Sequence, residues 1–274
     1  MGATVLPPRP ARRGNRPVLN IRQLNVRFGG LRVLNDATFT VRENAITGLI
    51  GPNGAGKTTL FNCITGLLPA ARGSVEFHGD PILGWRPDRI ARAGLVRTFQ
   101  LARGFPRMSV FEHLMLYGKH QPGESLLAAC LGSADARSRE AALREQAFQV
   151  ARRLKLDHVL DHLVVDISGG QKKLLEIGRA LMAEPRMLLL DEPMAGVNPT
   201  LAREIAEQLA RLREDGLTVL LIEHDLELVR LLCDDVVVMA EGAFLTRGGY
   251  DDVIANPAVQ DAYLGRRHAA RAAQ

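Results

Sequence analysis

The sequence predicts an α/β fold, and three observations lead to this prediction. A largely apolar run at residues 45–50 leads directly into a glycine-rich loop, and a helical pattern follows that loop. From residue 187 onward, short apolar runs alternate with amphipathic stretches, as they do in α/β units. Between these regions, residues 106–157 are mainly helical in pattern. We therefore expect an α/β core that is interrupted in its middle by a mostly helical lobe.

The residues before the glycine-rich loop predict three strands. Apolar and polar residues alternate over 18–28 and again over 37–41, which is typical of strands with one buried face. Residues 45–50 are typical of a fully buried strand. After the loop, the pattern predicts a helix over 58–65 that ends at Gly66.

The rest of the chain continues with short strands and amphipathic helices. A Gln-Pro-Gly break at 121–123 divides the helical middle region, and the small, polar residues 121–137 favour a variable insert there. The remaining strands are expected at 74–77, 95–99, 187–191, 218–223 and 236–239, and helices at 171–183 and 201–213.

The composition is that of a globular protein, and positive charge is concentrated at both ends of the chain. Of 274 residues, 46% are hydrophobic and 24% are charged, which excludes a disordered or collagen-like chain. The apolar runs are too short to span a bilayer. Residues 1–17 and 265–274 together hold seven arginines and no acidic residue. The whole chain has a net charge of +5, so the residues between these ends have a slightly negative net charge. We expect no nucleic-acid partner, because such domains carry their positive charge on a folded face.

Both basic ends are expected to lie outside the folded domain, which then covers residues 18–266. Residues 1–17 are rich in proline and arginine and predict a disordered leader, and residues 267–274 form a basic tail. Such ends are either merely solvated or weakly attracted to an anionic membrane surface. Three cysteines without metal-ligand spacing favour a reducing compartment, and the first twenty residues lack the apolar stretch of a secretory signal. We therefore expect a cytoplasmic protein.

The glycine-rich loop matches the phosphate-binding pattern G-x-x-x-x-G-K-[ST]. Glycines let successive backbone N–H groups surround phosphate oxygens, and the helix N-terminus that follows adds a partial positive charge. The lysine supplies a charge for the β- and γ-phosphates, and the threonine hydroxyl can bind Mg²⁺. An incidental glycine-rich turn would need neither the strand before it nor the helix after it. The loop residues are Gly51, Pro52, Asn53, Gly54, Ala55, Gly56, Lys57 and Thr58, followed by Thr59.

Two carboxylates end the buried strand at 187–191. At the carboxyl end of a strand beside a phosphate-binding loop, Asp191 is suited to bind Mg²⁺, directly or through a bound water. Glu192 then points elsewhere and can polarise an attacking water. The alternative for Glu192 is that it simply begins the loop to Pro193.

The segment Ser168, Gly169, Gly170 and Gln171 begins the predicted helix at 171–183 and allows two interpretations. Ser168 as N-cap, with Gln171 as the third helical residue, forms a capping box. However, two glycines in a cap are unfavourable unless the backbone approaches another group, and a helix N-terminus favours an anion. From these residues alone, both interpretations stay open.

Together, these segments resemble the motif set of ABC-type ATPases, over residues 18–264. The segment from Ser168 resembles the signature motif of that family. The other matching positions follow in the family's order: Phe28 resembles the adenine-stacking aromatic residue, Gln100 the Q-loop glutamine, Ala195–Asn198 the D-loop and His224 the switch histidine.

The resemblance implies a Mg²⁺-dependent ATPase with a P-loop core, an antiparallel β subdomain and a helical subdomain at about 101–182. It implies catalytic roles for Lys57, Gln100, Glu192 and His224, and a Mg²⁺ site made by Thr58, Gln100 and Asp191. It also implies that ATP is bound by Phe28, by Gly51 to Thr59 and by Ser168 to Gln171.

Three positions depart from the family's pattern. Ile167 precedes the signature where leucine is usual, Phe28 replaces the commoner tyrosine, and Asn198 replaces aspartate. Asn198 followed by Pro199 also fits a helix N-cap, so its role in the D-loop stays open. Phe28 would alternatively be a core residue that ends a strand.

Within the family, the sequences of three segments resemble the larger ATPase of LIV-type importers of branched-chain amino acids. These segments are Gly94–Gln100, Phe105–Val110 and Ala195–Pro199. Urea and amide importers and a lipopolysaccharide-export ATPase are the alternatives. A P-loop kinase or GTPase is disfavoured, because neither carries the signature and a GTPase would show Asn-Lys-x-Asp, which this sequence lacks.

The family pairs two chains head to tail, with ATP between the phosphate loop of one and the signature of the other. The resemblance thus implies a second ABC ATPase, with a heterodimer favoured over a homodimer. It also implies integral-membrane permease subunits, an indirect solute-binding protein, and a peripheral position on the cytoplasmic face of the membrane. Phe105, Met108 and Phe111 of the helical lobe either dock the permease or belong to the core of the lobe.

Overall fold

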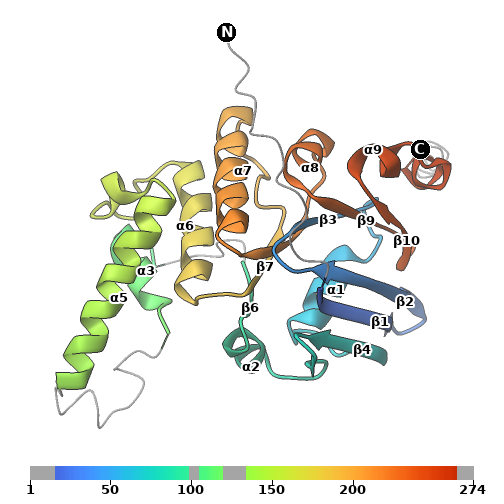
Figure 1. The fold of residues 1–274 in the computed structure, drawn as a ribbon, viewed down its shortest axis with the longest axis horizontal. Coiled ribbons are helices and arrows are strands. Elements are labelled where there is room, and N and C mark those ends of the chain that lie inside the picture. The colour runs from blue at the N-terminus through green and yellow to red at the C-terminus, as the bar shows by residue number, and fades with distance from the viewer. Residues whose placement is uncertain (1–15, 99–104, 120–133, 264–274) are drawn as a thin grey trace.

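The fold is built on two β-sheets and a helical lobe (Figure 1). The computed structural model describes residues 16–98, 105–119 and 134–263. The larger sheet has the strand order β10-β9-β3-β8-β7-β6, and the smaller has the order β2-β1-β4-β5. The predicted α/β fold, with a helical lobe and an antiparallel β subdomain, is confirmed. None of the helices in these described ranges is long and apolar enough to span a membrane.

Five strands of the larger sheet are parallel, and β10 pairs antiparallel with β9 at one edge. The strands are β3 (Ile46–Ile50), β6 (Leu95–Arg97), β7 (Met187–Asp191), β8 (Thr218–Ile222), β9 (Asp235–Ala240) and β10 (Ala243–Gly248). Central strands β3 and β8 are buried along their whole length, as parallel strands covered on both faces must be. The carboxyl ends of the five parallel strands meet at one edge, where ligands bind in open α/β sheets.

The smaller sheet is antiparallel throughout. Its strands are β1 (Pro17–Phe28), β2 (Leu31–Arg42), β4 (Arg72–Phe77) and β5 (Asp80–Pro81). Strand β1 begins at Pro17, the last residue of the predicted leader, because Pro17 already pairs with Arg42. Strand β5 was not predicted, since two residues carry no periodic pattern.

Helices form the lobe and cover the larger sheet (Figure 1). The lobe contains α3 (Val110–Leu116), α5 (Ala134–Arg153) and α6 (Gly169–Met182). The other helices are α1 (Lys57–Ile64), α2 (Pro87–Arg92), α7 (Pro199–Glu214), α8 (Leu226–Leu232) and α9 (Tyr250–Ile254), with a 3₁₀ turn at Asp157–Val159. Helices α2, α8 and α9 and strand β10 are not predicted from the sequence, because they are too short to show a clear period.

Side chains alternate along the strands between two hydrophobic clusters. In β7, Leu188 and Leu190 belong to the cluster shared with the lobe and α7, whereas Met187 and Leu189 belong to the cluster shared with α1 and the smaller sheet. Both faces of the larger sheet are therefore buried. The loops at the carboxyl ends of the parallel strands are therefore the places where polar side chains can meet a ligand.

Candidate functional site

The loop after β3 has the backbone shape of a phosphate cradle. Gly51, Gly54 and Gly56 have φ values of 147°, 74° and 92°, which favour glycine. A Cβ atom on Gly51 would lie 2.0 Å from the carbonyl oxygen of Met239, and one on Gly56 would lie 2.8 Å from that of Val33. Glycine at these two positions lets the loop fold tightly between β2 and β9.

Helix α1 begins directly after this cradle without a side-chain cap. Its N-cap residue is Gly56, and its first turn holds no acidic residue. The N–H groups at the start of α1 and the helix dipole therefore favour an anion, which fits a polyphosphate. Lys57 is buried along the cradle, where its Nζ donates to the carbonyl oxygens of Gly51 at 2.7 Å and of Pro52 at 3.1 Å. The neighbouring Thr58 is exposed.

Asp191, the last residue of β7, is held by a mostly buried ion pair. Its Oδ2 lies 2.8 Å from Nη2 of Arg97, and Nη1 of Arg97 donates to Oδ1 of Asn62 at 2.6 Å. Arg97 thus connects β6, β7 and α1. Thr58 and Asp191 could hold Mg²⁺, which takes one or two protein oxygens and completes its shell with phosphate and water. Accordingly, within the described ranges no three His, Cys, Asp or Glu side chains form a complete metal site of their own.

Glu192 and His224 meet at the ends of adjacent strands. Nε2 of His224 lies 2.7 Å from Oε1 of Glu192. The two residues follow β7 and β8, in which Asp191 is opposite Ile222. Both side chains are partly exposed and line an open hollow of about 960 Å³. A carboxylate beside an imidazole, both open to water, can remove a proton from that water.

Glu223 lies immediately before His224 and is buried, with 5% of its surface exposed. Its Oε1 accepts a hydrogen bond from the Met194 N–H at 3.1 Å, and its Oε2 accepts one from the His224 N–H at 3.2 Å. Burial raises the pKa of this carboxyl, and the hydrogen bonds from backbone N–H groups oppose that rise. Glu223 therefore touches both loops that carry Glu192 and His224.

The N-terminus of α6 has the predicted capping box. Oγ of Ser168 accepts from the Gln171 N–H at 3.2 Å, and Oε1 of Gln171 accepts from the Ser168 N–H at 2.8 Å. Packing requires glycine at position 170, because a Cβ atom there would lie 1.7 Å from Cδ2 of Leu201 on α7. Gly169, by contrast, faces open space. Helices α6 and α1 lie well apart in Figure 1, so this segment does not meet the phosphate cradle of its own chain.

Phe28 ends β1 with its side chain half exposed, at 51%, so the alternative that it is a core residue is wrong. Along the β1–β2 hairpin, Leu34 lies opposite Val26, and Leu31 lies opposite Phe28. The Leu34 side chain packs against Gly56 of the cradle. The open ring of Phe28 therefore lies at the end of the hairpin that covers the cradle.

Known proteins match this chain over nearly its whole length. The family model for ABC transporters matches residues 34–195. The chain belongs to the ABC transporter family. The high-affinity branched-chain amino acid transport ATP-binding protein BraF of Pseudomonas aeruginosa is 39% identical over 252 residues, covering 92% of this chain and 99% of BraF. Its counterpart LivG of Salmonella typhimurium is 37% identical over 252 residues, with the same two coverages of 92% and 99%.

A solved structure agrees with this assignment. The crystal structure of an ATP-binding cassette of an ABC transporter, in its ADP conformation, has a TM-score of 0.81 and 37% sequence identity to this chain. The match covers 92% of this chain and 100% of the chain in that crystal structure. The chain is thus an ATP-binding cassette of the ABC type, an ATPase coupled to transport.

In this ABC cassette Asn198, at the position that resembles the D-loop, is the N-cap of α7, as predicted. Its Oδ1 accepts from the Leu201 N–H at 3.0 Å, and Pro199 occupies the first helical turn. The predicted Q-loop glutamine, Gln100, lies outside the described residues.

Sequence reasoning missed three residues at the site of the cassette. Arg97 is the last residue of β6, and Glu223 directly follows the buried strand β8, next to the predicted site residue His224. A charged residue at the end of a strand was the signal that could have revealed them. Tyr263 lies far along the chain, yet the backbone of Gly51 acts on its hydroxyl: burial raises the pKa of Tyr263, and the Gly51 backbone opposes that rise. No local pattern could have related Tyr263 to the cradle.

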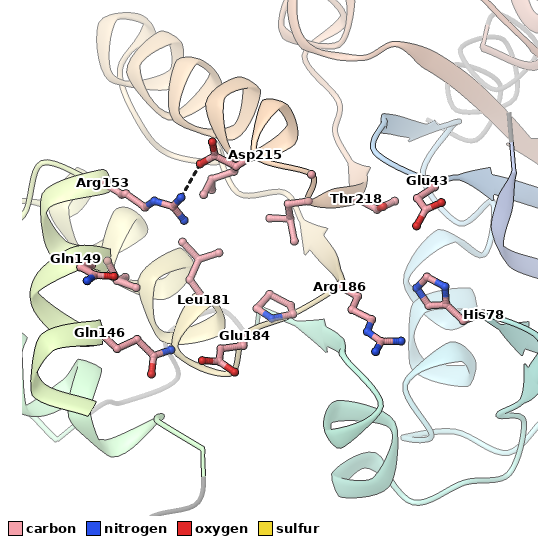
Figure 2. Close-up of a pocket in the computed structure, with 15 residues that line it drawn as sticks. Glu43, His78, Gln146, Gln149, Arg153, Leu181, Glu184, Arg186, Asp215 and Thr218 are labelled. Atoms are coloured by element: carbon pink, nitrogen blue, oxygen red, sulfur yellow. Dashed lines mark hydrogen bonds and ion pairs between the residues drawn. The ribbon is translucent and has the colours of Figure 1, made fainter. Parts of the chain in front are cut away.

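A second hollow, of about 670 Å³, lies at the opposite edge of the larger sheet (Figure 2). Arg186 and Thr218 line it at the amino ends of β7 and β8, and residues of α5 face them across the hollow. An ion pair of 2.7 Å between Arg153 and Asp215 connects α5 with the end of α7 there. Because it lies at the amino ends of the strands, this hollow is separate from the phosphate cradle.

Proposed function

We propose that this ABC cassette hydrolyses ATP to drive the import of branched-chain amino acids through a separate membrane permease. The observation that carries the proposal is the 2.7 Å contact between Glu192 and His224 at the strand ends that also bear the phosphate cradle. The names of BraF and LivG, which match nearly the whole chain, support branched-chain amino acids over urea, amides or lipopolysaccharide.

The cradle residues bind the nucleotide. When bound, ATP with Mg²⁺ supplies the phosphoanhydride bond that breaks and a cation that neutralises phosphate charge. The N–H groups at the start of α1 bind phosphate oxygens, and Nζ of Lys57 exchanges its carbonyl partners for the β- and γ-phosphates. Thr58 and Asp191 would hold Mg²⁺, and the resemblance adds Gln100 to them. The ring of Phe28 stacks on adenine.

Glu192 serves as the general base in this proposal. Its carboxylate takes a proton from the attacking water, and His224 fixes the orientation of that carboxylate through Nε2. Glu192 is suited to this role because its side chain is partly exposed and its Oε1 already has a hydrogen-bond partner.

A second ABC cassette completes the site. Helix α6, which begins at the signature, lies away from α1 and its cradle in Figure 1, so a head-to-tail partner supplies the signature. The resemblance to LIV-type importers favours a different ATPase over a second copy. Phe105, with 60% of its surface exposed, offers a contact for a cytoplasmic helix of the permease. Phe111 instead packs against Phe148, at 5.1 Å between ring centroids, and belongs to the lobe. In this arrangement the cassette lies peripherally on the cytoplasmic face of the membrane, and a solute-binding protein acts indirectly.

Reconstitution tests the proposal. The chain is purified from detergent-solubilised membranes with its co-purifying membrane proteins and placed in vesicles that contain ATP. We expect ATP-dependent uptake of labelled leucine and none with Glu192→Gln. Uptake of labelled urea alone would overturn the solute class, and a complex that does not hydrolyse ATP would overturn the function itself.

A further inference from the structure

Glu223 joins the two loops that carry Glu192 and His224. Its two carboxylate oxygens accept from different loops, Oε1 from Met194 after β7 and Oε2 from His224 after β8. Since Met194 is two residues beyond Glu192, this carboxylate fixes the path of the turn that bears Glu192. The side chain is also buried, so water competes little for these hydrogen bonds.

The turn at Glu192 needs such support. Glu192 has φ 51°, in the left-handed region that non-glycine residues adopt only when the surrounding structure holds them there. One restraint is the Glu192 N–H, which donates to the Ile222 carbonyl at 3.0 Å. The second is the hydrogen bond from Met194 to Glu223. The turn is thereby attached to the end of β8 at two points.

We propose that Glu223 is a positioning residue for ATP hydrolysis, which keeps the Glu192 carboxylate within hydrogen-bond reach of the His224 imidazole. Its described contacts are with backbone N–H groups, so it acts through the two loops. This inference rests on the proposed roles of Glu192 and His224. It adds a third carboxylate to the site, with a role different from that of Asp191 or Glu192.

The direct test is Glu223→Gln. The amide keeps the shape of the side chain and one carbonyl oxygen, but it presents an NH₂ group to one of the two backbone donors. We expect kcat for ATP hydrolysis to fall roughly 10- to 100-fold, because small displacements of a catalytic group are costly. KM and the Kd for ATP should change less than about twofold, since the cradle is untouched.

Two further variants separate positioning from folding. Glu223→Asp keeps the charge, but its side chain is one methylene too short to reach both N–H groups, so kcat should fall in this variant too. The aspartate variant therefore still tests the inference if Glu223→Gln does not fold. Asp235→Asn is the matched control, a buried carboxylate in β9 that is paired with Arg247 at 2.5 Å. It should lower the melting temperature and leave kcat unchanged.

The effect of Glu223→Gln is also measured in a protein that already carries Glu192→Gln. A merely structural role for Glu223 would give the same loss of rate in this protein as in the wild type. In single-turnover assays, adding Glu223→Gln to Glu192→Gln should reduce the residual rate by less than about twofold, because no base is left to misplace. Equal losses in both backgrounds, or wild-type kcat in both Glu223 variants while Glu192→Gln is inactive, would overturn the inference alone. Near-wild-type turnover in Glu192→Gln would instead overturn the proposed site.

Discussion

The Arg97 guanidinium lies 2.8 Å from Oδ2 of Asp191, and it links this carboxylate to Asn62 on α1. The side chains of Arg97 and Asp191 are only 8% and 18% exposed, so water screens the pair little. The carboxylate proposed to hold Mg²⁺ is therefore already oriented by a fixed cation. This one side chain connects strands β6 and β7 with helix α1.

Removal of the Arg97 charge should destabilise the fold. In Arg97→Met the Asp191 carboxylate loses its ion-pair partner in a mostly buried place, and we expect the free energy of unfolding to fall by about 3 kcal/mol. Urea denaturation measures this loss. Adding Asp191→Asn should recover part of it, because the uncompensated charge is then gone. A double variant as unstable as the sum of both single variants would show that the two residues are not coupled.

Loss of the proposed base should stop turnover without loss of ATP binding. In Glu192→Gln we expect kcat to fall by roughly 10²–10⁴-fold, because general-base catalysis is lost while the cradle stays intact. Size-exclusion chromatography with ATP should then show a trapped dimer with the partner cassette.

Lys57→Ala is the contrasting variant. It removes the positive charge from the cradle, so an equilibrium titration should show weakened ATP binding. If Glu192→Gln hydrolyses ATP at nearly the wild-type rate, the base lies elsewhere, and His224 is the next candidate.

The ring of Phe28 should contribute to ATP affinity. Base–aromatic stacking contributes about 1–3 kcal/mol in nucleic-acid complexes, so Phe28→Ala should weaken ATP binding by roughly 5- to 150-fold. Phe28→Tyr should keep the affinity, and ATP and GTP should differ only modestly, because stacking does not read the edge of the base.

Leu31→Ala is the matched control for Phe28, since Leu31 lies opposite it and is 67% exposed. This variant should bind ATP as the wild type does. Unchanged ATP affinity in a Phe28→Ala protein that melts normally would exclude the stacking role.

The Cys63 thiol on α1 should resist ionisation. Burial raises its pKa from 9.0 to about 11. The thiol keeps its proton in the folded protein at pH values where the unfolded chain has lost it, so its contribution to stability is present below pH 9 and is lost as the pH rises toward 11. Between pH 9 and pH 11, the free energy of unfolding should therefore fall by about 2 kcal/mol more in the wild type than in Cys63→Ala.

Two measurements check this prediction. Urea denaturation at pH 8 and at pH 10.5 compares the wild type with Cys63→Ala. Peptide mass spectrometry after brief iodoacetamide treatment at pH 8 should show Cys63 unlabelled in the native protein and labelled in urea. Fast labelling of native Cys63 would contradict the raised pKa.

Features that depend on neighbours in the chain were predictable. The spacing from Gly51 to Thr58 sets the cradle, because tight backbone approach and a helix N-terminus are local requirements. The caps at Ser168 and Asn198 were predictable for the same reason, since a cap joins residues three apart. The strands were predictable where burial produces alternation or a continuous apolar run over five or more residues.

The longer elements, the cradle and most of the residues at the site thus follow from the amino-acid sequence alone. Three contacts instead depend on how the elements pack: Glu192 meets His224, Arg97 orients Asp191, and Gly170 leaves room for Leu201. These contacts join residues from separate elements, and they depend on β7 lying between β6 and β8 and on how α6 packs against α7. The periodicity of a strand reports which of its faces is buried, but it carries no information about the neighbouring strand that supplies the partner.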